Sequence, residues 1–459
     1  MQMSLSQVAA ITHGALIGQD QMFSNVSTDS RTLKSGDLFI ALSGDNFDGH
    51  TFVEAAAQQG ACGVVVERQL NNPIPQVKVA NVLKALGDLA HAWRMQINPK
   101  VIALTGSNGK TTLKEMLAAI LAPSFHLLAT QGNLNNDIGV PLTLLRLQDE
   151  ALAVIEMGAN HLGEIDYLSN MAKPDIAILN NAGLAHVGEF GSAENIGRGK
   201  AEIINGLSAD GVFIYHADSR WVGLWQQLSA AKNSISFGFS ENADYQLLKP
   251  TLTLQKTDQG FVSAFSVVEK QTATTVDIEL QLAGWHNAMN ALAAIATARQ
   301  LGLSFEQIKQ GLAQLPPVKG RLHSMAGNLG QWLIDDSYNA NPDSVKAAID
   351  VLAAIDGKRL LVLGELAELG EQADNMLADI GQYARDKNID AVLTVGQKTA
   401  AAASAAFGYG GLHFDNQQAL ITHLQQIADA DQVILVKGSR AAKMEKVIKA
   451  LVVTGEGAC

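Results

Sequence analysis

An apolar run that leads into a glycine-rich turn and then a helical pattern is the most restrictive feature of this sequence. The run is Val101-Ile102-Ala103-Leu104, and the helical pattern covers residues 110–121. The turn and the first helical residues are Thr105, Gly106, Ser107, Asn108, Gly109, Lys110, Thr111 and Thr112. A strand joined to a helix in this way begins a parallel α/β unit, so we expect a parallel sheet.

The turn has the composition of a phosphate-binding loop. Glycines let backbone amides curl around phosphate oxygens, and the helix N-terminus adds partial positive charge. Lys110 would reach the β- and γ-phosphates of ATP, and the Thr111 hydroxyl would ligate Mg²⁺. A purely structural turn is the alternative, but it does not account for a lysine followed by two threonines. The sequence therefore predicts a nucleotide site.

The length of the chain and two proline-containing breaks between periodic segments predict three α/β domains. At 459 residues the chain is too long for one hydrophobic core. Asn98-Pro99 and Pro316-Pro317 divide it into residues 1–98, 99–315 and 316–459. Strand and helix patterns alternate in the second and third segments, which predicts a central doubly wound, mostly parallel sheet and a Rossmann-like third domain. Residues 246–283 instead predict antiparallel hairpins, and residues 287–301 a helix. The first segment predicts a smaller α/β domain.

Charge and cysteine content limit the class of protein. The net charge of −12 disfavours nucleic-acid binding and association with an anionic membrane surface. Two cysteines, Cys62 and Cys459, cannot form a disulfide framework. The N-terminus lacks the pattern of a signal peptide, and no run of 18 apolar residues suggests a membrane span. We expect a soluble cytoplasmic protein without membrane insertion.

Two further residues are candidate metal ligands by position. Glu156 ends an apolar strand pattern, and His186 follows the next one in a glycine-bracketed loop. Ligands bind at the carboxyl ends of strands in open α/β sheets, and phosphoryl transfer needs such metal ligands. A solvated acid and a structural histidine are the alternatives. Lys200 by itself reads as a charge on a helix surface.

Together these residues resemble the Mur ligases over essentially the whole chain. The loop at residues 105–112 is similar to the family's TGTNGKTT-type loop, and the resemblance implies that ATP and Mg²⁺ bind there. It also implies that Glu156 and His186 hold the metal and that Lys200 carries a carbamate. The catalytic residues implied by the resemblance are Lys110, His186, Lys200 and Arg321.

The resemblance extends to the expected nucleotide and substrate contacts. Asn287 and Asn290 match asparagines that approach adenine (Asn287 could also cap its helix), Arg321 matches an arginine that reaches a phosphate, and Asp336 matches a ribose ligand. The segments around residues 27–50 resemble a UDP-binding domain. The implied substrate contacts are Ser30, Arg31, Asp48, His50, Asn135, Asn136, Asn339, Asn341 and Ser439. The last three belong to the third segment and are expected to hold the incoming dipeptide.

The motifs of the third segment suggest which reaction of the family to expect. They are Asp336-Ser337-Tyr338-Asn339-Ala340-Asn341-Pro342 and Lys437-Gly438-Ser439-Arg440. The resemblance implies ATP-dependent joining of D-alanyl-D-alanine to UDP-N-acetylmuramoyl-tripeptide through an acyl phosphate. Because the reactants arrive on three separate domains, we also expect the third domain to close onto the loop, with the hinge near Pro316-Pro317. We expect a monomer. Another Mur-type ligase, folylpolyglutamate synthase or a P-loop ATPase switch are the alternatives.

Overall fold

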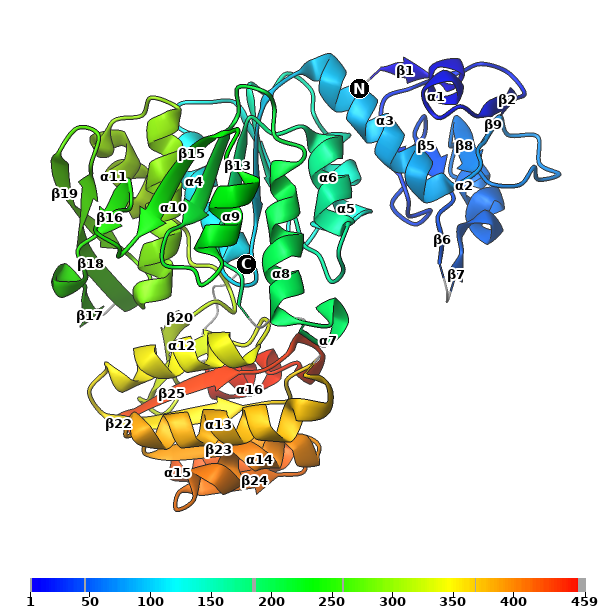
Figure 1. Ribbon diagram of the computed structural model, residues 1–459. Helices are drawn as coiled ribbons and strands as arrows, with labels where there is room; N and C mark the ends of the chain where they lie inside the picture. Colours follow the sequence, from blue (N-terminus) through cyan, green and yellow to red (C-terminus); the bar gives the residue numbers. More distant parts are fainter. Residues whose placement is uncertain (1, 45–46, 184–186, 258–259, 368, 453–459) are drawn as a thin grey trace.

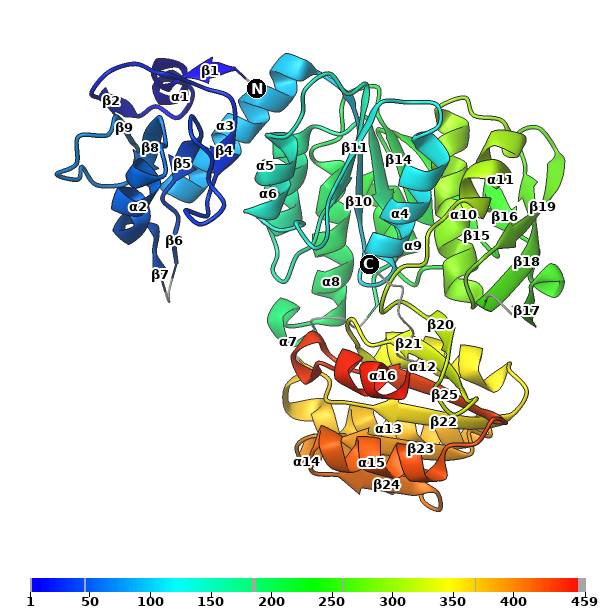
Figure 2. The ribbon, with the colours of Figure 1, turned by 180° about the vertical axis from the view of Figure 1, so that it is seen from behind.

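The computed structural model describes residues 2–44, 47–183, 187–257, 260–367 and 369–452. Three large sheets, each built from a separate stretch of chain, form the cores of three units (Figure 1). The central unit contacts both of the others, and the N-terminal and C-terminal units lie on different sides of it (Figure 2). The predicted divisions at residues 98 and 315 stay predictions of domain boundaries, and each sheet lies within one of the predicted segments. No described helix has the length and apolar character needed to cross a membrane.

The N-terminal unit contains a five-stranded sheet in the order β2-β9-β8-β5-β4. A capping box at Ser4 begins its first helix, and Asn81 caps its last. Its strands are β2 (Ala15–Ile17), β4 (Val26–Ser27), β5 (Leu38–Ile40), β8 (Gly63–Val66) and β9 (Gln76–Lys78), with the short pairs β1 (Met3–Ser4) and β3 (Met22–Phe23), and β6 (Ser43–Gly44) and β7 (Phe47–Asp48). Its helices are α1 (Leu5–Ile11), η1 (Gly49–Phe52), α2 (Val53–Gln58) and α3 (Val82–Ile97).

The central unit contains a ten-stranded sheet in the order β11-β12-β10-β13-β14-β15-β16-β18-β17, with β19 paired to β18. The pairs from β11 to β16 are parallel, and those of β17, β18 and β19 are antiparallel. The strands are β10 (Lys100–Thr105), β11 (Leu127–Ala129), β12 (Leu152–Glu156), β13 (Ile176–Leu179), β14 (Val212–His216), β15 (Asn233–Gly238), β16 (Tyr245–Leu247), β17 (Thr253–Thr257), β18 (Gly260–Glu269) and β19 (Thr274–Leu280).

Helices cover both faces of the central sheet, as expected for a doubly wound fold. Apolar residues of α4, α10 and α11 pack on one face. Those of α5, α6 and α8 pack on the other face, in a core that also includes α3 of the N-terminal unit. The helices are α4 (Lys110–Leu121), α5 (Gly139–Leu144), α6 (Glu164–Ala172), α7 (Val187–Phe190), α8 (Ala193–Ala201), η2 (Glu202–Ile204), α9 (Val222–Leu228), η3 (Lys249–Thr251), α10 (Trp285–Gln300) and α11 (Phe305–Ala313).

The C-terminal unit contains a six-stranded sheet in the order β20-β21-β25-β22-β23-β24, and only its edge strand β20 is antiparallel. Helices α12, α13 and α14 cover one face, and α15 and α16 the other. The elements are β20 (His323–Ala326), β21 (Trp332–Asp336), α12 (Pro342–Ala353), β22 (Lys358–Leu363), η4 (Gly370–Gln372), α13 (Ala373–Asp386), β23 (Ala391–Val395), α14 (Lys398–Phe407), β24 (Gly411–Phe414), α15 (Gln417–Ile427), β25 (Gln432–Lys437), η5 (Arg440–Ala442) and α16 (Glu445–Leu451). This sheet and the central one confirm the predicted fold class.

Helix α3 connects the first two units through hydrogen bonds and apolar packing. The Trp93 indole donates a 2.9 Å hydrogen bond to the carbonyl of Leu147, and the Arg94 guanidinium donates to the carbonyls of Ala172 and Lys173 at 2.6 and 2.8 Å. Because α3 also contributes to the core beneath α5 and α6, it belongs to the central unit as much as to its own.

Candidate active site

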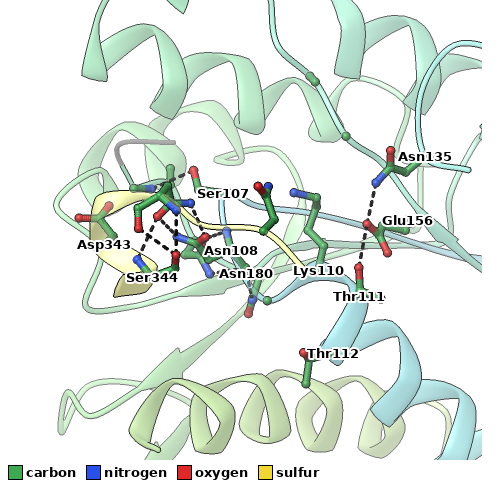
Figure 3. Close-up of a pocket in the computed structure, with 18 of the residues that line it drawn as sticks. Ser107, Asn108, Lys110, Thr111, Thr112, Asn135, Glu156, Asn180, Asp343 and Ser344 are labelled. Carbon is green, nitrogen blue, oxygen red and sulfur yellow. Dashed lines mark hydrogen bonds between the residues drawn. The ribbon is translucent and has the colours of Figure 1, made fainter. Parts of the chain in front are cut away.

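A cavity of about 1400 Å³ lies where the carboxyl ends of the central strands face the C-terminal unit. The residues that line it come from all three units: the start of α3, the phosphate loop, the ends of β12, β13 and β14, the start of α10, and the first turn of α12. Parallel sheets bind ligands at this edge. Figure 3 shows the part of the cavity around the phosphate loop.

The phosphate loop connects β10 to α4. Gly109 has φ +77° and precedes the first residue of α4, and a Cβ at this position would lie 2.5 Å from Oδ1 of Asn290. Both the backbone angle and the close approach therefore require glycine. The Lys110 ammonium donates a 2.7 Å hydrogen bond to the Gly106 carbonyl. Burial lowers the pKa of Lys110, and the nearby Glu156 carboxylate opposes that effect.

The loop is held in place by carboxamides. The Asn108 amide donates to Oδ1 of Asn181 at 2.9 Å, and Nδ2 of Asn181 donates to the Asn108 carbonyl at 2.8 Å. Asn180 donates to the same carbonyl at 3.2 Å and to Oδ1 of Asn290 at 2.7 Å. Asn290 donates to Asn287 at 3.3 Å. The two asparagines predicted to approach adenine line the cavity, and Asn290 also accepts a hydrogen bond from Asn180, which holds the loop.

The remaining loop residues have local partners. The Thr105 hydroxyl donates a 2.8 Å hydrogen bond to the Met157 carbonyl, and the Ser107 hydroxyl accepts one from the Gly183 amide at 3.0 Å. The side chains of Thr111 and Thr112 line the cavity. Asn287 does not cap its helix, because α10 begins at Trp285 with Gly284 as its N-cap, so the capping alternative is wrong.

A buried carboxylate lies beside the loop. Glu156 is 1% exposed, and its Oε1 accepts hydrogen bonds from Nδ2 of Asn135 at 2.7 Å and from the Thr111 hydroxyl at 3.4 Å (Figure 3). Its Oε2 has no hydrogen-bond partner among the described residues. A buried, unsatisfied carboxylate oxygen beside a threonine hydroxyl fits a hard cation such as Mg²⁺. Asn136 lines the same wall and accepts a 2.9 Å hydrogen bond from the Gly139 amide.

Lys200 on α8 is as buried as Glu156, not a surface charge as its sequence alone suggests. It is 1% exposed, donates a 3.0 Å hydrogen bond to the Ala159 carbonyl, and lies over the Phe190 ring. Burial, followed by the charge of Lys110, lowers its pKa to about 7. His186 lies outside the described residues. The described part of the chain contains no group of three histidine, cysteine or acidic side chains that could hold a metal.

The C-terminal unit adds three cations and an aromatic ring to this region. The Arg321 guanidinium lies 4.4 Å from the centre of the Tyr338 ring, and the Arg440 guanidinium 5.6 Å from it. Lys437 donates to Oδ2 of Asp336 at 2.6 Å and to the Asn339 carbonyl at 3.1 Å. Sequence reasoning quoted Lys437 but did not assign it to the site. A lysine at the carboxyl end of the apolar run 433–436 was the available signal, because ligands bind at the carboxyl ends of strands in open α/β sheets.

The predicted dipeptide contacts have different surroundings. Asn339 and Asn341 line the cavity. Asn341 caps α12 by accepting from the Ser344 amide at 2.9 Å, and it donates to Oδ1 of Asn108 at 2.7 Å. Ser439 is 2% exposed, its amide donates to the Glu365 carbonyl at 2.8 Å, and it is not among the cavity-lining residues.

The predicted UDP contacts lie away from the cavity. Arg31 is exposed and paired with Asp29 at 2.7 Å. His50 is 4% exposed, and both ring nitrogens are occupied: Nδ1 lies 2.7 Å from Asp48, and Nε2 accepts from the Glu67 amide at 2.9 Å. None of Ser30, Arg31, Asp48 and His50 lines the cavity, whereas Asn81, Leu83 and Lys84 at the start of α3 do. No sequence motif distinguished these three residues.

Hydrogen bonds from Arg68 and then from His50 hold the pKa of Asp48 well below its usual range. Asp48 also accepts from the Ser43 hydroxyl at 3.1 Å. Asp48 and His50 therefore connect β6 and β7 to the end of β8.

Comparison with known proteins covers nearly the whole chain. Residues 22–94 match the Mur ligase family catalytic domain, residues 104–298 the Mur ligase middle domain, and residues 320–440 the Mur ligase glutamate ligase domain. The UDP-N-acetylmuramoyl-tripeptide–D-alanyl-D-alanine ligases of Escherichia coli (strain K12) and Bacillus subtilis (strain 168) are 43% and 35% identical to it, over 98% of each chain.

Solved structures agree with the sequence relatives. A crystal structure of MurF from Acinetobacter baumannii is 37% identical, with a TM-score of 0.91 and 98% of each chain covered. The MurF ligase from Thermotoga maritima in complex with ADP is 28% identical, with a TM-score of 0.83, and the match covers 93% of this chain and 96% of that one. The chain therefore belongs to the Mur ligase family.

Proposed function

We propose that this chain joins D-alanyl-D-alanine to UDP-N-acetylmuramoyl-tripeptide, with ATP cleaved to ADP and phosphate. The observation that carries the proposal is the convergence of Lys110, Glu156 and Arg321 on one cavity that all three units line. Lys200 lies next to this cavity and donates a hydrogen bond to the carbonyl of Ala159, which lines it. The two relatives that bear this activity in their names match 98% of the chain. We expect the reaction to take place in the cytoplasm.

The chain's own groups support an acyl-phosphate route. The terminal carboxylate of the tripeptide attacks the γ-phosphorus of ATP, the bond to the β-γ bridging oxygen breaks, and ADP leaves. Lys110 and Arg321 are placed to offset the negative charge that develops on the phosphoryl oxygens. The dipeptide's neutral amine then attacks the activated carbonyl, phosphate leaves, and the amine loses a proton.

Glu156 and Thr111 are the residues that would hold Mg²⁺, which supplies charge neutralisation of the phosphates when bound. The unpaired Oε2 of Glu156 supports this assignment. Lys200 lies next to the cavity and donates to the carbonyl of Ala159, which lines it. Its pKa of about 7 leaves much of the amine neutral at physiological pH. A neutral amine is the form that adds carbon dioxide, so a carbamate on Lys200 is part of the proposal. His186 remains a predicted ligand.

Phosphate release tests the proposed function. The full chain is supplied with ATP, Mg²⁺, the UDP-linked tripeptide and D-alanyl-D-alanine, and each component is then omitted in turn. We expect release only with all components present, with the joined product detected by mass spectrometry. Release without either substrate indicates an ATPase switch, and release with a different amine or acceptor indicates another Mur-type ligase. Tripeptides that end in diaminopimelate or lysine, in competition, would identify the third residue.

A further inference from the structure

Two asparagines 233 residues apart join the phosphate loop to the C-terminal unit. Nδ2 of Asn341 donates to Oδ1 of Asn108 at 2.7 Å, and Nδ2 of Asn108 lies 3.5 Å from Oδ1 of Asn341. Both side chains are partly buried at the edge of the cavity. In Figure 1, α12 lies on the side of the C-terminal unit that faces the central unit.

The Asn108 side chain is available for this contact because the backbone of Asn108 is fixed separately. Asn180 and Asn181 hold its amide and carbonyl. In the part of the chain that the structure describes, the side-chain hydrogen bonds of Asn108 run to Asn341. Truncating Asn108 at Cβ therefore removes the contact between units and leaves the hydrogen bonds that shape the loop.

Asn341 is fixed to the C-terminal unit through helix α12, so its position relative to the phosphate loop follows that of the unit. It is the N-cap of α12 in a reciprocal capping box with Ser344, and α12 packs Val345 and Ile349 into the core of the C-terminal unit. A second close approach lies beside it, because a Cβ at Gly183 would come within 2.5 Å of Oδ2 of Asp343. Gly183 in turn donates to Ser107 of the phosphate loop.

We propose that Asn341 is a positioning residue that acts through Asn108 and couples the placement of the C-terminal unit to the phosphate loop. The proposal rests on the proposed function and deepens it. Arg321 and Lys437 belong to the C-terminal unit, whereas Lys110 belongs to the loop. The reaction therefore needs the C-terminal unit held in a fixed position relative to the loop. Loss of the contact lowers kcat and leaves the affinity of the loop for ADP unchanged.

A double-mutant cycle tests the coupling. The variants are Asn108→Ala, Asn341→Ser and the double variant; serine keeps the helix cap but is too short to reach Asn108. The control is Asn416→Ser, which makes the same change at the N-cap of α15, where Asn416 accepts from the Ala419 amide and has no partner from another unit among the described residues. We expect each single variant and the double variant to lose about tenfold in kcat, with the ADP affinity of Asn341→Ser within about twofold of that of the parent chain.

If the two substitutions acted independently, their effects on kcat would multiply and the double variant would lose about a hundredfold. That result would overturn the proposal. A rise in KM for the dipeptide on Asn341→Ser, equal in the parent chain and in the Asn108→Ala background, would also overturn it and make Asn341 a substrate contact. Small-angle scattering with ADP decides the coupling even if the parent chain joins no substrates. We expect the same increase in maximum dimension in both single variants and none in Asn416→Ser, and unchanged dimensions in the single variants would contradict the coupling.

Discussion

Lys437 donates a 2.6 Å hydrogen bond to Asp336, and both side chains are buried where β25 and β21 end side by side at the cavity. The pair joins the last residue of one parallel strand to the last residue of its neighbour. Burial lowers the pKa of Lys437, and the Asp336 carboxylate opposes that effect. A carboxylate predicted to hold ribose thus also neutralises a lysine that sequence reasoning had left out of the site.

Removing one partner of this pair should cost more than removing both. Lys437→Met leaves the Asp336 carboxylate buried without its cation, which is expected to cost about 3–5 kcal/mol. The double variant Asp336→Asn, Lys437→Met is expected to recover a large part of that loss. Urea unfolding followed by circular dichroism measures both. Equal stability of Lys437→Met and the parent chain would show that the pair is dispensable for folding.

Lys110→Ala should abolish turnover without unfolding the chain. The ammonium is held at the loop by one hydrogen bond to Gly106 and supports no apolar core, so the far-ultraviolet circular dichroism should not change. We expect kcat to fall by about 10²–10³-fold or more, because a charge that stabilises the transferring phosphoryl group is lost. Lys100→Ala, at the exposed start of β10, the strand that leads into the loop, is the matched control and should retain activity.

Glu156→Gln should change the requirement for Mg²⁺. Glutamine keeps an oxygen that can accept from Asn135 but removes the negative charge that a divalent cation needs. The Mg²⁺ concentration for half-maximal rate is expected to rise at least about tenfold. ADP binding measured without Mg²⁺ should be similar in both proteins. An unchanged Mg²⁺ dependence would exclude Glu156 as a ligand.

Lys200→Ala should be inactive and partly rescued by formate or acetate. The lysine is buried against Phe190 and Ala159, so alanine leaves a space that a small carboxylate can enter. A carboxylate there replaces the anionic oxygens of a carbamate. Rates are measured against carboxylate concentration, with chloride at equal ionic strength as the control. Rescue by chloride alone would remove the case for a carbamate.

Stability should fall in acid partly through His286. Burial, followed by the charge of Lys437, lowers its pKa from 6.5 to about 4. The unfolded chain therefore binds the proton more tightly, and the stability that neutral His286 provides is full above pH 6.5 and is lost as the pH falls through 6.5 toward 4. Melting temperatures of the parent chain and His286→Gln, compared from about pH 7 to pH 4.5, should shift in favour of the variant. His126→Gln, at an exposed histidine, is the control.

Local patterns predicted the sheets well and the long-range contacts poorly. The apolar runs before the phosphate loop and Glu156 became β10 and β12, because each contains its own signal for a buried strand. The hairpins predicted at residues 246–283 formed, but their strands extend the parallel sheet through the β16–β18 pair. Whether a hairpin pairs with a distant sheet depends on which sheet edge is available in the folded protein. The sequence of the hairpin alone does not determine this.

The candidate site shows the same limit at the level of single residues. The motif around Asp48 and His50 reads as a ligand contact, yet both ring nitrogens of His50 are occupied within its own unit. Lys200 reads as a surface charge because helix periodicity does not show what packs over it. The Asn108–Asn341 contact lies between units and left no trace in either local pattern.

The carboxamides around the phosphate loop have one more consequence. Asn180, Asn181, Asn290 and Asn341 carry no charge and do not titrate in the physiological range. Salt screens interactions between charges and acid protonates carboxylates, but neither acts directly on an amide-to-amide hydrogen bond. The hydrogen bonds from these carboxamides to the loop are therefore insensitive to the pH and ionic strength that affect charged groups such as Lys110 and Glu156. Changes in pH or ionic strength should alter what binds and how fast it reacts, on a framework that stays the same.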